Sequence, residues 1–97
     1  MPQFIYNESG QTVGFIHDNY IHDMDGDAVG QLEGTHVHKL SGEYVAELYE
    51  DMIVETYANY GDIRSAKNPG RLSVPRHPGT RGIINYGYPD ASAKLFR

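Results

Sequence analysis

The sequence predicts an all-β protein of tandem 16-residue β-hairpin repeats with pseudo-four-fold symmetry, followed by an extended tail rich in proline and glycine. Three observations support this prediction. The same pattern of apolar residues and glycine recurs every 16 residues, a turn signature divides each repeat, and no apolar periodicity of 3.6 residues appears before residue 60. Helices are therefore not expected in the repeats.

The repeat is visible when residues 4–51 are divided into three blocks, FIYNESGQTVGFIHDN, YIHDMDGDAVGQLEGT and HVHKLSGEYVAELYED. The aligned columns are Ile5, Ile21 and Val37; Gly10, Gly26 and Gly42; Val13, Val29 and Val45; and Ile16, Leu32 and Leu48. A fourth block keeps the opening apolar pair Met52 and Ile53 and then diverges. We predict a repeat domain at 4–67, with units 4–19, 20–35, 36–51 and a degenerate 52–67, and a tail at 68–97.

Each block is predicted to form one hairpin. A short first strand such as YIHD, rich in β-branched and aromatic residues, precedes a turn, and a second strand such as AVGQL follows it. Asn or Asp at the first position of the turn and glycine at the fourth favour a type I turn with a glycine bulge. The predicted turn residues are Asn7, Gly10, Asp23, Gly26 and Gly42. A lone hairpin is unstable in water, so we expect the hairpins to pack around an axis, with Gly14, Gly30 and Ala46 nearest to it.

The segment YIHDMDGDAVG, residues 20–30, carries aspartates at alternate positions, as a calcium loop does. The repeat explains them differently, because Asp23 takes the turn position that Asn7 takes one repeat earlier, where its carboxylate can accept a backbone hydrogen bond. The glycine stands fourth in the loop rather than sixth, and no glutamate stands at position twelve, so the EF-hand pattern is not met. We interpret the segment as a turn.

The tail holds four of the five prolines and is predicted to be an extended, semi-rigid connector. Near its end, Asp90 followed by Ala91, Ala93 and Lys94 predicts a short terminal helix of about two turns, with Asp90 as the N-cap. Large apolar residues indicate that the tail docks, on its own chain or on another. The expected docking residues are Ile83, Ile84, Tyr86, Tyr88, Leu95 and Phe96.

Composition and charge narrow the class of protein. The absence of cysteine excludes disulfides and Cys-ligated zinc, and no signal peptide or membrane-spanning run is seen, so we expect a cytoplasmic protein. The net charge of −5 divides unevenly, with 12 acids against 3 bases in residues 1–67 and 1 acid against 5 bases in residues 68–97. This division favours a basic tail that docks on an acidic body, its own or a neighbour's.

Three histidines are the candidate metal ligands. His36 and His38 stand two apart on one strand and share a face, and His22 occupies the column of His38. The same column holds Tyr6 and Val54, which an amphipathic sheet face explains more simply. A metal-binding protein that uses His22, His36 and His38 is therefore the alternative hypothesis, and no cofactor is predicted.

Two other functions are disfavoured. The acids fall in turns and exposed columns, and a thin core leaves little volume for a buried pocket, so we expect no enzyme and no catalytic residues. Binding of nucleic acid would use basic and aromatic tail residues, but the acidic body would repel phosphate. Those tail residues are Arg71, Arg76, Arg81, Lys94, Tyr86 and Tyr88.

The predicted function is a non-enzymatic interaction module that binds a protein partner or self-associates through its tail. We expect the ligand or partner face on the first strands, at Tyr6, Tyr20, His22, His36 and His38. Additional contact area is expected from the exposed aromatics Tyr44, Tyr49, Tyr57 and Tyr60.

Tandem units of the form apolar–Asp/Asn–turn–Gly–Val–Gly–apolar, followed by the tail RGIINYGYPDASAKLF, resemble the bacterial four-fold beta-flower family. The resemblance covers nearly the whole chain and implies a small all-β domain with pseudo-four-fold symmetry. It implies no particular activity and no catalytic residues. The fourth block departs from the pattern, with Ala58 in the glycine column and Arg64 in the late apolar column, and leaves open whether one chain closes the ring.

Overall fold

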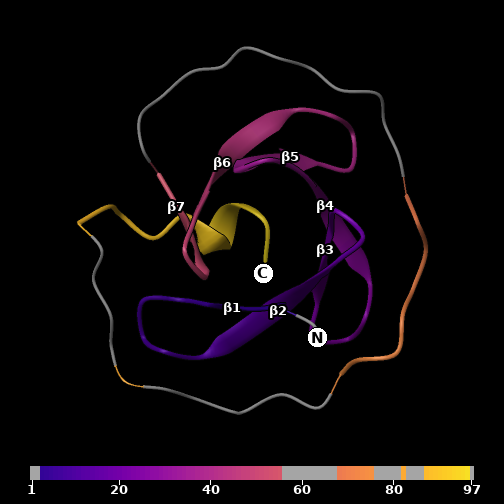
Figure 1. Ribbon diagram of the computed structural model, residues 1–97, viewed down its shortest axis with the longest axis horizontal. Coiled ribbons are helices and arrows are strands. Elements are labelled where there is room, and N and C mark those ends of the chain that lie inside the picture. The colour runs from indigo at the N-terminus through magenta and orange to yellow at the C-terminus, as the bar shows by residue number, and fades with distance from the viewer. Residues whose placement is uncertain (1–2, 56–67, 76–81, 83–86, 97) are drawn as a thin grey trace.

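A computed structural model of the chain describes residues 3–55, 68–75, 82 and 87–96. The elements in this part of the chain are β1 (Gln3–Tyr6), β2 (Thr12–His17), β3 (Tyr20–Asp23), β4 (Ala28–Glu33), β5 (His36–Lys39), β6 (Tyr44–Tyr49), β7 (Met52–Val54) and the 3-10 helix η1 (Ser92–Lys94). The strands form a closed barrel in chain order, and the end of the chain lies inside the ring (Figure 1). The predicted all-β fold is confirmed.

The 16-residue repeat is also a structural repeat. The hairpins β1–β2, β3–β4 and β5–β6 are antiparallel, and the register of each shifts at the equivalent place, before Tyr6, His22 and His38. At the turns, the N–H groups of Gly10, Gly26 and Gly42 donate to the carbonyl oxygens three residues earlier, at 3.0, 3.0 and 2.9 Å. These glycines have φ of 84°, 89° and 102°, a conformation that side chains disfavour.

Asn7 and Asp23 fold the first two turns in the same way. Asn7 Oδ1 accepts from the N–H groups of Ser9 and Gln11, both at 3.0 Å. Asp23 Oδ1 accepts from those of Asp25 and Asp27 at 2.9 and 3.0 Å. The aspartate that suggested a calcium loop thus satisfies backbone donors of its own turn.

The core lies around the barrel axis. One first-strand column supplies four side chains that are all fully buried, Ile5, Ile21, Val37 and Ile53. Opposite the first three lie the small residues Gly14, Gly30 and Ala46 of the second strands. Leu95 and Phe96 from the end of the chain pack against this cluster. The docking of these two residues occurs within the same chain.

The fourth sector, which consists of β7 and residues 89–96, is built differently. The Glu55 N–H donates to Pro89 O and the Ala91 N–H donates to Ile53 O, both at 2.9 Å, with an antiparallel bridge between Val54 and Asp90. This register places Ala91 opposite Ile53, where the three hairpins have a small residue. Since β1 pairs with β7 at Tyr6 and Met52, the ring closes within one chain.

The predicted two-turn helix is wrong in length, because η1 is one 3-10 turn of three residues. The chain pairs with β7 up to Ala91 and must then bring Leu95 into the core, which leaves room for a single turn. Asp90 instead joins two segments: Oδ1 accepts from the Ser92 N–H at 2.9 Å and Oδ2 from the Glu8 N–H at 3.1 Å.

Some predictions fall on residues outside the described part of the chain. These residues are Tyr57, Ala58, Tyr60, Arg64, Arg76, Arg81, Ile83, Ile84 and Tyr86. Most of the fourth repeat unit, residues 56–67, is among them. The division into a domain at 4–67 and a tail at 68–97 therefore stays a prediction.

Candidate functional site

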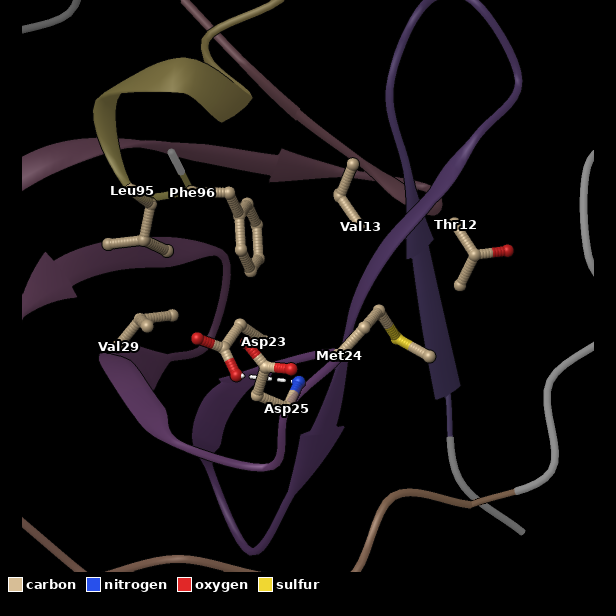
Figure 2. Close-up of a pocket in the computed structure, with 8 residues that line it drawn as sticks. All are labelled: Thr12, Val13, Asp23, Met24, Asp25, Val29, Leu95 and Phe96. Atoms are coloured by element: carbon tan, nitrogen blue, oxygen red, sulfur yellow. Dashed lines mark hydrogen bonds between the residues drawn. The ribbon is translucent and has the colours of Figure 1, made fainter.

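A pocket of about 460 Å³ opens between β2, the β3–β4 turn and the end of the chain. We call it the Phe96 pocket. It is lined by Thr12, Val13, Asp23, Met24, Asp25, Val29, Leu95 and Phe96 (Figure 2). The ring of Phe96 stands between Val13 and Val29, which occupy the same column of successive repeats. The repeat and the distant C-terminal segment therefore build the pocket together.

Two glycines make room for the wall of the pocket. A Cβ atom on Gly14 would lie 2.6 Å from Cε1 of Phe96 and 2.4 Å from the His22 carbonyl oxygen. A Cβ atom on Gly30 would lie 3.1 Å from both terminal methyl carbons of Leu95. The small-residue column thus admits the two C-terminal side chains to the centre of the barrel.

The charge beside the Phe96 pocket is negative. Asp23 has one carboxylate oxygen occupied by backbone donors, and Asp25 is exposed, with no hydrogen bond or ion pair of its carboxylate to the residues described. The nearby Arg71 donates from Nε to the Asp25 carbonyl oxygen at 3.1 Å and lies 3.7 Å from Asp27 Oδ1. Arg71 therefore pairs with Asp27, and it makes no ion pair with the two carboxylates of the pocket lining among the contacts described.

A second polar cluster lies in the third hairpin. Glu47 is 8% exposed and accepts hydrogen bonds from Thr35 Oγ1 and the Tyr44 hydroxyl, both at 2.8 Å. Its Oε2 also lies 2.7 Å from His36 Nδ1. These contacts satisfy the buried carboxylate and tie the β4–β5 turn to β6, so a structural role accounts for the cluster.

The predicted ligand face is not one open surface, which corrects our expectation for His22 and His38. Both imidazoles are buried, at 0% and 1% exposed, because the strands bury both of their faces. His22 stacks on Phe15 with ring centroids 5.2 Å apart, and its Nδ1 lies 3.0 Å from Gly26 O. The remaining residues, Tyr6, Tyr20 and His36, are half-buried.

The histidines proposed as alternative metal ligands do not come together. Among the described residues, no group of three or more His, Cys, Asp or Glu side chains is placed to hold a metal ion. His38 packs edge-on against Tyr44 with centroids 5.6 Å apart, while His36 contacts Glu47. Neither ring nitrogen of His38 has a hydrogen-bond partner in the part of the chain described.

Sequence reasoning did not identify the Phe96 pocket as a site. It did identify Leu95 and Phe96 as docking residues and Gly14 and Gly30 as the column nearest the axis. The missing signal was their combination, since two glycines facing the axis leave space that large side chains must fill. Tyr88 of the expected docking set is 42% exposed and contacts Tyr49, with ring centroids 5.5 Å apart.

Comparison with known protein families places the chain in a described family. A family model described as 4-fold beta flower protein matches residues 3–83, which is most of the chain. No curated protein and no solved structure matches the chain. Of the helical residues described, none belongs to a helix long and apolar enough to cross a membrane.

Proposed function

The chain belongs to the 4-fold beta flower protein family, and we propose that it is a small non-enzymatic interaction module that binds a segment of a partner protein at the Phe96 pocket. The observation that carries the proposal is the lining of the pocket. Its walls are apolar, from Val13, Met24, Val29, Leu95 and Phe96, and the carboxylates of Asp23 and Asp25 stand beside them.

This lining favours a partner segment that combines an apolar side chain with a cationic one. A volume of about 460 Å³ lies within the range of sites that hold small groups, and the flexible thioether of Met24 adapts to different apolar shapes. Lysine and arginine carry a charged end on an apolar stem, which suits a pocket with apolar walls and an acidic mouth. The net charge of −5 would also attract a basic segment before contact.

We propose no catalytic role for this site. Among the described residues of the lining, Thr12 is the one hydroxyl, and no histidine, lysine or cysteine accompanies it as a base or nucleophile. Asp23 already accepts two backbone hydrogen bonds through Oδ1. A cytoplasmic location is part of the same proposal and is supported by the absence of cysteine.

Titration of the ¹⁵N-labelled full chain with three synthetic peptides tests the proposal. The peptides alternate leucine with lysine, glutamine or glutamate. We expect the lysine peptide to shift the amide signals of Val13, Met24 and Val29, with weaker binding of the glutamine peptide and the weakest binding of the glutamate peptide. Absence of shifts at these residues with all three peptides would contradict the proposal.

Removal of one charge gives a matched control. Asp25→Asn should weaken binding of the lysine peptide about three- to five-fold, because one favourable Coulomb contact is lost. Asp18→Asn removes the same charge from the β2–β3 turn, away from the pocket lining, and should leave the affinity nearly unchanged. Equal losses in the two variants would mean that attraction is general rather than local to the pocket.

A further inference from the structure

The fourth sector is closed by a segment that is remote from it in sequence. We infer that residues 89–96 are an exchangeable segment, and that the partner fitting the site they fill is a second copy of this chain. In the exchanged form each copy would donate its own segment to the other and receive the other's in return. Such reciprocal exchange closes on itself as a symmetric dimer.

The contacts of the segment define the site that it fills. Two backbone hydrogen bonds join it to β7, Ala91 and Ser92 are buried at 3% and 7% exposure, and Lys94 pairs with Glu55. Leu95 and Phe96 pack against the core cluster around the barrel axis. Residues 89–96 of a second copy could make all of these contacts with β7 in the same geometry.

The connector distinguishes this sector from the hairpins. In the first hairpin, residues 7–11 alone join β1 to β2, so the two strands must pair within one chain. In the fourth sector, residues 56–88 separate the paired segments, a connection of 33 residues (88 − 55). Leu72 of this connection is held to the β3–β4 turn, where its N–H donates to Gly26 O at 2.9 Å.

The connector is long enough to reach a neighbouring copy even if residues 68–75 keep their place. The 13 residues from 76 to 88 (88 − 75) span up to about 45 Å when extended. The longest dimension of the molecule is 34 Å. Exchange therefore does not require residues 68–75 to leave the barrel.

Concentration decides between the two forms, because their contacts are the same. Because a connector of this length keeps the segment close to its own β7, at an effective concentration on the order of 1 mM, pairing within one chain dominates in dilute solution. Folding at comparable chain concentrations allows the second copy to compete. In the exchanged dimer, Leu95 and Phe96 of one copy would line the Phe96 pocket of the other.

Cysteine pairs placed in different chains test the inference, since the natural chain has none. Glu55→Cys in one chain and Lys94→Cys in another replace two residues whose side chains contact each other. After treatment with a thiol-to-thiol crosslinker whose spacer replaces the reach of the two long side chains, we expect no interchain crosslink when the mixture was refolded at about 1 µM, and a substantial covalent heterodimer when it was refolded at about 1 mM. The double variant E55C/K94C should crosslink within one chain at the lower concentration.

A matched control pair uses an ion pair inside a hairpin. Lys39→Cys in one chain and Glu43→Cys in another replace residues whose charged groups lie 3.7 Å apart in the third hairpin. This pair should give no heterodimer at either concentration, because the short turn holds both residues in one chain. The inference is overturned if this pair crosslinks as well as E55C with K94C, or if the latter pair gives no heterodimer at about 1 mM.

The unmodified chain gives a second, independent measurement. Light scattering should find monomers after refolding at about 1 µM and a dimer fraction, slow to dissociate on dilution, after refolding at about 1 mM. Monomers after both treatments would overturn the inference. Neither experiment contains a ligand, so a negative result leaves the proposed function of the Phe96 pocket untouched.

Discussion

The three hairpin sectors and the fourth sector reach the same geometry by different routes. In each hairpin a fully buried aliphatic residue faces a small residue across a short turn, as Ile21 faces Gly30. In the fourth sector Ile53 faces Ala91, which lies 38 positions away (91 − 53). All four sectors therefore share the small residue opposite the aliphatic column, whereas the short turn is one of two ways in which the chain supplies it.

The largest expected effect on stability comes from removing the equivalent core side chain in a hairpin sector and in the fourth sector. Ile21→Ala and Ile53→Ala should each lower the free energy of unfolding by about 4 kcal/mol, since both residues are fully buried in one core. Urea unfolding followed by circular dichroism measures both. Two separate transitions in the Ile53→Ala variant would instead show that the fourth sector unfolds independently of the hairpins.

The small-residue column should resist enlargement. Gly14→Ala is expected to destabilise the protein by about 3 kcal/mol, because the new methyl group would lie 2.4 Å from a backbone carbonyl oxygen that cannot swing away. Gly82→Ala is the control, since a Cβ atom there meets no atom of the described residues within 4 Å. Thermal unfolding of both variants measures the difference, and similar melting temperatures would contradict the role of the column in packing.

Whether a structural feature could be predicted from the sequence depends on how far apart in the chain its interacting residues lie. The all-β fold with its hairpins and the family were predicted correctly, because the turn at Asn7 or Asp23 and the aliphatic columns are encoded within 16 residues. The pairing of Ala91 with Ile53 in the fourth sector was not predicted, because two residues 38 positions apart (91 − 53) leave no local pattern. The sequence does not show whether the outer face of the first strands is buried or exposed to solvent. The prediction therefore assigned His22 and His38 to an accessible ligand face.

The outer faces of the sectors also differ, and this difference predicts a smaller effect of opposite sign. Val54 occupies in the fourth sector the column that His38 occupies in the third, and both are buried. His38→Val should raise the free energy of unfolding by about 1 kcal/mol, because the imidazole carries a buried N–H without an acceptor among the residues described. His17→Val, on an exposed side chain, is the control in the same denaturant titration. A loss of stability in His38→Val would show that contact with Tyr44 outweighs the unmade hydrogen bond.

The smallest effect concerns the charged contact at the surface of the fourth sector. Lys94→Ala removes the ion pair between Lys94 and Glu55. Both side chains are partly exposed, and an ion pair of this kind contributes about 0.5 kcal/mol to the free energy of unfolding. We expect this small loss in low salt and none in 1 M salt, where screening acts within about 3 Å. Lys39→Ala, which breaks the exposed pair with Glu43 inside the third hairpin, is the matched variant. If Lys94→Ala is much the more harmful of the two and salt does not reduce the difference, the lysine stem contributes by packing the segment onto β7 rather than by its charge.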